Sequence, residues 1–220
     1  NLVAANGGAP EDVKVVNIIG HSDKYKGYAK ADLPANVWDI TDGKFTDRVY
    51  MEWNAANGTI TVSTPGSIVR SKGTCYAMFQ NLTGLEKVDL SGLDISRSTQ
   101  MVQMFDNCTN LKSVDLTPLN TANVTTMYLM FSNCEKLETV KLTGLNTAKV
   151  TNFEKLFYQC YSLKSVDIST WNTQSVTNMY RMFYDCKSLE EVNLKCAQTS
   201  LASTKLKEMF ANCSSLKRID

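Results

Sequence analysis

Seven cysteines and one histidine are the residues of this chain best suited to nucleophilic or metal chemistry. A catalytic thiol needs a general base within hydrogen-bonding distance, and His21 lies in a Gly/Ser/Asp/Lys stretch far from the cysteines in sequence. No cysteine pair has zinc-site spacing, and neither an H-E-x-x-H motif nor a Gly-rich phosphate loop is present. We therefore expect no enzyme activity, no catalytic residue, no metal site and no cofactor.

Acidic residues at a regular spacing form a second candidate for metal chemistry. Carboxylates recur at Asp89, Asp115 and Asp167, with Lys141 interrupting the series. Asp89 and Asp115 could approach one cation, but calcium needs more oxygen ligands than two carboxylates supply. We interpret these side chains as solvated carboxylates.

Most of the cysteines belong to an internal repeat with a period of 26 residues. Met104-Phe-Asp-Asn-Cys108 is followed by Met130-Phe-Ser-Asn-Cys134, Leu156-Phe-Tyr-Gln-Cys160, Met182-Phe-Tyr-Asp-Cys186 and, one residue late, Met209-Phe-Ala-Asn-Cys213. A degenerate first copy reads Met78-Phe-Gln-Asn-Leu82. Such periods are typical of solenoids, in which each repeat buries its apolar face against its neighbours. The pattern predicts that these five cysteines are buried and reduced, whereas Cys196 falls in a turn position.

Each repeat predicts a short helix followed by a short strand. Met127, Met130 and Phe131 have the i, i+3, i+4 spacing of one helix face, and a threonine, Thr125, precedes them as a potential cap. The following L-x-x-V-x-L pattern, as in residues 137–142, predicts an inward-facing strand. We therefore predict an α/β fold, a right-handed leucine-rich-repeat solenoid with parallel strands on one wall and helices on the other.

An alternating column of charges supports the stacking of these coils. Neighbouring strands of a sheet lie about 4.8 Å apart, so equivalent residues of successive coils should be adjacent. The residue after each leading leucine alternates in sign, which places opposite charges side by side. The column is Glu86, Lys112, Glu138, Lys164, Glu190 and Lys217.

The repeat resembles the BspA-like leucine-rich repeat family, in particular its bacterial surface protein 26-residue type. That pattern is Asn-Val-Thr-x-Met-x-x-Met-Phe-x-x-Cys-x-x-Leu-x-x-Val-Asp-Leu. It matches 123–142 except for Lys141, and 175–194 except for Ser175 and Asn193. Residues 149–168 fit it with Lys149 in place of Asn and with Phe153 and Leu156 in place of Met. The resemblance covers residues 75–220. It implies a cell-surface or secreted bacterial protein and, since some members are implicated in adhesion to host proteins or other microbes, a recognition role without a specified ligand. We also expect the natural protein to continue beyond Asp220. Because the chain begins at Asn1, we interpret it as a processed or trimmed product, from which an export signal or lipid anchor could have been removed.

The first 74 residues lack the repeat and predict a β-rich N-terminal cap. Residues 13–19 read as a strand, and residues 48–53 and 59–63 as a hairpin whose turn is Asn57-Gly58. This hairpin would cover the first coil of the solenoid. Residues 1–10 read as a flexible lead-in, and residues 20–47 carry no clear pattern. The predicted domains are thus 1–74 and 75–220.

We predict that the contact surface lies on the predicted helical wall. Helical geometry turns Arg181 and Tyr184 outward with Tyr180 at the flank. One coil earlier Lys155 and Tyr158 occupy the equivalent outward positions, and Tyr161 follows at the next turn. Exposed tyrosine and arginine are the residue types that carry interface energy. An alternative interpretation is that these tyrosines only stack between coils.

Charge and hydropathy limit the partners. The net charge of +1 favours neither nucleic acid nor an anionic membrane, and no apolar run is long enough for membrane insertion. We expect a monomer that binds an unknown host or microbial surface protein or glycan. The alternative is a structural spacer or stalk that displays other domains of a longer surface protein.

Overall fold

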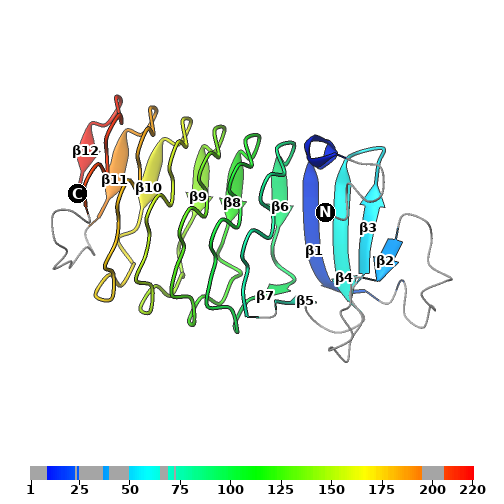
Figure 1. Cartoon of the computed structure of the whole chain (residues 1–220). Helices are drawn as coiled ribbons and strands as arrows, with labels where there is room; N and C mark the ends of the chain where they lie inside the picture. The colour runs from blue at the N-terminus through cyan, green and yellow to red at the C-terminus, as the bar shows by residue number, and fades with distance from the viewer. Residues whose placement is uncertain are drawn as a thin grey trace.

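The computed structural model describes residues 9–22, 24, 37–39, 50–64, 69–71, 73–194 and 206–220. Figure 1 shows a row of stacked coils with a sheet at the N-terminal end. The described elements are η1, a 3-10 helix (Pro10–Asp12), and strands β1 (Val15–His21), β2 (Val37–Asp39), β3 (Tyr50–Asn54), β4 (Thr59–Thr64), β5 (Val69–Arg70), β6 (Lys87–Asp89), β7 (Leu93–Asp94), β8 (Ser113–Asp115), β9 (Thr139–Lys141), β10 (Ser165–Asp167), β11 (Glu191–Asn193) and β12 (Arg218–Ile219).

The N-terminal sheet has the order β2-β3-β4-β1-β6 and joins the cap to the first coil (Figure 1). The predicted hairpin is present, because β3 and β4 pair antiparallel around Asn57-Gly58. The sequence predicted that this hairpin covers the first coil, and that prediction is wrong. Instead β1 lies between them and pairs in parallel with both β4 and β6. Of the predicted lead-in, residues 1–8 lie outside the described residues, and Pro10 begins η1.

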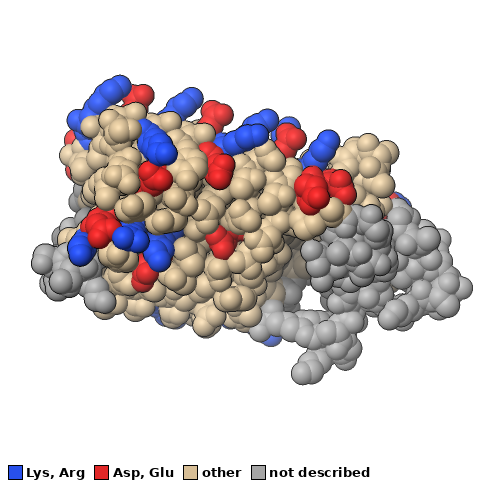
Figure 2. Space-filling model, turned by 45° about the horizontal axis from the view of Figure 1, so that its top comes forward, with Lys and Arg blue, Asp and Glu red and all other residues tan. Residues whose placement is uncertain are grey.

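The short strands β6 and β8–β12 form one wall of the stack, the strand wall, and their charged side chains are adjacent as the alternating column predicted. Parallel pairing places Val114 opposite Val140 and Val166 opposite Val192. The ammonium groups of Lys112, Lys164 and Lys217 lie 3.5, 3.5 and 2.9 Å from the carboxylates of Glu86, Glu138 and Glu190. Figure 2 shows cationic and anionic side chains alternating along this edge of the molecule.

The predicted helical wall is wrong, and with it the α/β leucine-rich-repeat class. No α-helix occurs in the described residues, where the only helical element is η1. The segments expected to be helical are chains of turns (Figure 1). We call this surface the turn wall; it comprises residues 75–82, 101–108, 127–134, 153–160, 179–186 and 206–213.

Backbone hydrogen bonds explain why these segments are turns. Within one coil, Met130 N–H donates to the Met127 carbonyl at 3.2 Å and Cys134 N–H to the Phe131 carbonyl at 3.2 Å. These are i to i−3 bonds of β-turns, whereas an α-helix makes i to i−4 bonds. Other N–H groups point along the stack: that of Phe131 donates to the Leu156 carbonyl of the next coil at 2.9 Å.

Positive φ angles recur at two positions of each coil on the turn wall. Leu129 has φ 56° and Asn133 has φ 57°, each at the third residue of a turn, where a type II turn needs a positive φ. The full set is Ala77, Asn81, Gln103, Asn107, Leu129, Asn133, Lys155, Gln159, Arg181, Asp185, Glu208 and Asn212.

The threonines expected to cap helices link coils instead. The Thr125 hydroxyl donates to the Thr99 carbonyl at 3.0 Å, and the Thr151 hydroxyl donates to the Thr125 carbonyl at 3.2 Å. Thr177 repeats the contact to Thr151 at 3.1 Å. Each hydroxyl therefore adds a bond along the stack and caps no helix.

Two ladders of identical side chains fill the core. The rings of Phe79, Phe105, Phe131, Phe157, Phe183 and Phe210 stack successively with centroids 5.1–5.5 Å apart. The thiols of Cys108, Cys134, Cys160, Cys186 and Cys213 donate to the carbonyl of the phenylalanine one coil earlier, at 3.0–3.1 Å.

The prediction of reduced, buried ladder cysteines holds for four of these five. All five are free thiols, but Cys213 is only half-buried. Burial raises the pKa of the Cys108 thiol to about 12, so it stays protonated and can donate at neutral pH. Cys196 lies outside the described residues.

Candidate functional site

Two of the predicted contact residues form a stacked pair on the turn wall. The rings of Tyr158 and Tyr184 lie with centroids 5.1 Å apart and planes inclined by 10°. The repeat sets this spacing: Gln159 N–H donates to the Tyr184 carbonyl at 2.9 Å, which holds the two backbones one coil apart. The predicted adjacency is therefore present, and both rings are half-buried.

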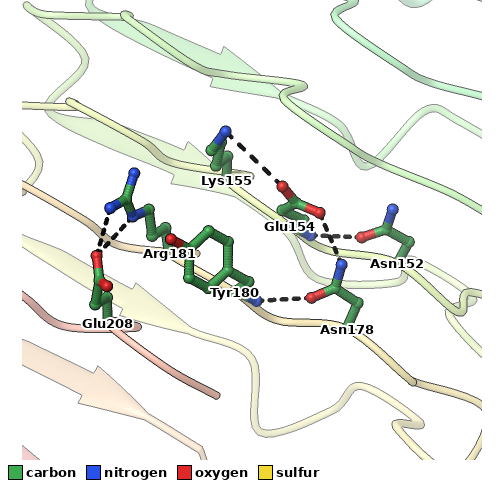
Figure 3. Close-up of polar contacts among 7 residues, drawn as sticks. All are labelled: Asn152, Glu154, Lys155, Asn178, Tyr180, Arg181 and Glu208. Carbon is green, nitrogen blue, oxygen red and sulfur yellow. Dashed lines mark hydrogen bonds and ion pairs between the residues drawn. The ribbon is translucent and has the colours of Figure 1, made fainter. Parts of the chain in front are cut away.

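Arg181 lies between two of the tyrosines. Its guanidinium carbon is 5.0 Å from the centroid of the Tyr180 ring and 4.8 Å from that of Tyr184, within cation–π range. The same group binds Glu208 of the next coil, with Nε and Nη2 at 2.7 and 2.6 Å from one carboxylate oxygen (Figure 3). The hydrogen bond to Glu208 raises the pKa of Arg181. Arg181 is thus a paired, partly covered cation, whereas the sequence predicted an exposed one.

A polar network continues into the preceding coil. The Glu154 carboxylate accepts a hydrogen bond from the Asn178 side-chain amide at 2.8 Å and lies 3.8 Å from the Lys155 ammonium (Figure 3). The side-chain carbonyl of Asn178 in turn accepts from Tyr180 N–H at 3.0 Å. These contacts fix the backbone that carries Tyr180.

Tyr161 lies at the edge of this surface. The Lys187 ammonium is 4.7 Å from its ring centroid. Partial burial and the nearby carboxylates of Asp185 and Glu135 raise the pKa of its hydroxyl. We refer to Tyr158, Tyr161, Tyr180, Arg181 and Tyr184 together as the tyrosine patch.

Sequence reasoning missed the two carboxylates that neutralise the cations of this surface. Glu154 is the counterpart of Tyr180 one coil earlier and was recoverable from the period alone. Glu208 is the counterpart of Arg181 only when the one-residue delay of the last repeat is applied. The pairing of Arg181 with Glu208 could therefore be predicted from the sequence, but only by allowing for the extra residue before the last repeat.

The described residues contain no cluster of potential metal ligands. No group of three or more His, Cys, Asp or Glu side chains there could hold a metal ion. The Asp115 carboxylate of the acidic series already has partners in the protein, since hydrogen bonds from Thr117 and from Lys141 lower its pKa to about 2. The backbone of His21 ends β1 in the cap. Within the same residues, no helix has the length and apolar character needed to cross a membrane.

Comparison with known proteins identifies a family. The family described as "Mycoplasma protein of unknown function, DUF285" matches residues 73–195, more than half of the 220-residue chain. No curated protein and no solved structure matches. The matched residues cover the first five turn-wall segments with the strands that follow them, and so carry the Phe and Cys ladders as far as Phe183 and Cys186 and the whole tyrosine patch. The chain therefore belongs to this bacterial repeat family, the DUF285 proteins.

Proposed function

We propose that the chain is a non-catalytic recognition module of a bacterial cell-surface or secreted protein, and that its partner contacts the tyrosine patch. The partner would be a protein or glycan on a host or on another microbe. The family match supports a bacterial repeat protein, and the resemblance to the BspA-like surface proteins supports the location and the adhesive role.

The observation that carries this proposal is that the patch residues depart from the repeat, whereas the core residues follow it. Inward positions repeat the same residue types from coil to coil, as the Phe and Cys ladders do. The position of Tyr158 varies in residue type, because the coils carry there Gln80, Asp106, Ser132, Tyr158, Tyr184 and Ala211. Aromatic residues occur at this position in two adjacent coils only, and Arg181 joins them. Tyrosine and arginine in one cluster are the types enriched among interface hot spots.

The geometry also favours a particular kind of partner. Glu208 neutralises Arg181, and Glu154 lies beside Lys155, so the patch carries little uncompensated charge. Stacking and the ion pair hold the Arg181 guanidinium in place, which reduces the entropy lost on binding. Such a surface suits a neutral partner with apolar and hydrogen-bonding groups better than a polyanion.

A double Tyr158→Ser, Tyr184→Ser variant tests the proposal. Binding of labelled protein would be measured on cultured epithelial cells and on immobilised fibronectin, type I collagen and mucin. We expect the variant to lose about tenfold in affinity, which corresponds to about 1.4 kcal/mol. The matched control is Tyr76→Ser, Tyr128→Ser, which removes two tyrosines from the same wall outside the patch. Equal loss in both variants, or none in the first, would contradict the proposal.

The Tyr158–Tyr184 stack also supports a second function, a rigid spacer. Together with the Phe ladder and the turn-wall hydrogen bonds, it ties successive coils along the whole stack. An aromatic pair stabilises by about 0.5–1.5 kcal/mol. A spacer therefore predicts that the double variant unfolds at lower denaturant concentration while its binding stays at the wild-type level.

A further inference from the structure

A hollow of about 340 Å³ opens on the N-terminal cap, away from the tyrosine patch. It lies between η1 and the β3–β4 turn, and Figure 1 shows η1 at the same end of the cap as that turn. Its volume is in the lower part of the range of small-ligand sites. The lining residues are Glu11, Asp12, Lys14, Trp53, Ala55, Ala56, Asn57 and Gly58.

The walls of this hollow are fixed by close backbone contacts. Lys14 N–H and Val15 N–H both donate to the Gly58 carbonyl, at 2.8 and 3.1 Å. Gly58 has φ +67°, and a Cβ there would collide with the Asp12 carbonyl, so only glycine allows this approach. On the other side, a Cβ at Gly84 would collide with the Glu11 carbonyl. The segment that carries Glu11 and Asp12 is therefore held between the hairpin and the first coil.

The side chains around the hollow combine an aromatic surface with both kinds of hydrogen-bonding group. Trp53 is half-buried, while Glu11, Asp12, Lys14 and Asn57 are exposed. The two carboxylates only accept hydrogen bonds, the ammonium group only donates, and the amide does both. An ionic ligand of either sign would meet a like charge here. A ligand with an apolar face and several hydroxyl groups, each able to donate and accept, matches all of them.

We propose that this hollow binds one sugar unit of a glycan. The C–H face of the sugar packs on the Trp53 indole, and its hydroxyl groups bond to Glu11, Asp12, Lys14 and Asn57. The tyrosine patch is not needed for this contact. The cap is thus a second binding element of the protein and not merely a cover for the first coil.

The first experiment tests whether the full chain binds sugars. Labelled protein is applied to a printed array of mammalian and bacterial glycans. Saturation-transfer difference NMR is then recorded with galactose, mannose, fucose and N-acetylglucosamine. We expect binding in both, with transfer concentrated on the C–H protons of one sugar face, because the indole contacts that face. No binding in either experiment overturns the proposal.

Variants then assign the binding to the hollow. Lys14→Ala removes an exposed donor and should weaken binding about tenfold, the equivalent of about 1.4 kcal/mol, without a change in melting temperature. Trp53→Ala should abolish binding. Since Trp53 also packs partly on the core, Trp53→Phe serves as the folded counterpart and should retain weakened binding. The double Tyr158→Ser, Tyr184→Ser variant should bind sugars as the wild type does. Sugar binding that survives both Lys14→Ala and Trp53→Phe unchanged would place the glycan elsewhere and refute the assignment.

Discussion

A glycine substitution at Ala77 distinguishes the turn wall from a helical wall, because the two structures predict changes of opposite sign in the free energy of unfolding. Ala77 has φ 51°, its N–H donates to the Val102 carbonyl at 2.9 Å, and its carbonyl accepts from Gln80 N–H at 3.2 Å. A residue with a Cβ in the left-handed region costs about 1–2 kcal/mol relative to a favourable conformation. Glycine avoids this cost but loses about 0.5–1 kcal/mol through its greater freedom in the unfolded chain.

The difference predicts that Ala77→Gly raises the free energy of unfolding by about 0.5–1 kcal/mol. The matched control is Ala122→Gly, because Ala122 is also half-buried but is not among the residues of positive φ. The control should lower the free energy of unfolding by about 0.5–1 kcal/mol.

Urea titration followed by far-ultraviolet circular dichroism measures both changes as shifts of the midpoint at constant m value. In a helix, glycine at position 77 would also destabilise, by about 1 kcal/mol. If Ala77→Gly and Ala122→Gly lower the midpoint alike, the turn geometry derived above is refuted.

Three further predictions concern the strand wall and the thiol ladder. Lys164→Glu places three like charges in a row with Glu138 and Glu190, so the free energy of unfolding from urea titration should fall by less than about 1 kcal/mol, and the loss should shrink in high salt; a loss that salt leaves unchanged would contradict the stacking. Cys160→Asp buries a carboxylate in the core and should cost about 3 kcal/mol or more, against about 1 kcal/mol for Cys160→Ala, in the same titration; similar costs would mean that the position is open to solvent. Burial raises the pKa of Cys108 to about 12, whereas an unfolded thiol ionises near about 8.5. Its stabilising contribution is therefore complete below about pH 8.5 and is lost towards pH 12, with a slope of up to about 1.4 kcal/mol per pH unit. Cys108→Ala should consequently lose less stability than the wild type between these values, and an equal loss would exclude this thiol as the cause.

Much of the architecture was predictable because each coil repeats the same inward residues. The period alone placed Phe131 beside Phe157 and Lys164 beside Glu138, and both contacts are present. It also placed Tyr158 against Tyr184. Any fold that stacks coils of constant length brings equivalent side chains together, so these predictions did not depend on the conformation of the wall.

The cap was predicted less completely. Alternating apolar residues and Asn57-Gly58 identified the β3–β4 hairpin, since both signals are local. The insertion of β1 between this hairpin and β6 is a parallel, long-range pairing that no local pattern reports. The hollow beside Trp53 depends on the same arrangement, because Gly58 and Gly84 bring η1 between two segments that are distant in sequence.

The sequence by itself determined the period, the inward residues and the neighbours along the stack, whereas the tertiary structure decided the conformation of the turn wall. The spacing of Met127, Met130 and Phe131 buries the same side chains in a helical turn or in overlapping β-turns. A helix of two turns is marginal on its own, so its internal bonds do not decide the outcome. The next coil presents carbonyl groups at the matching spacing, such as those of Asn152 and Leu156, and the N–H groups bond to them. That choice exists only once the coils are stacked, which is why residue spacing favoured a helix and the folded chain has none there.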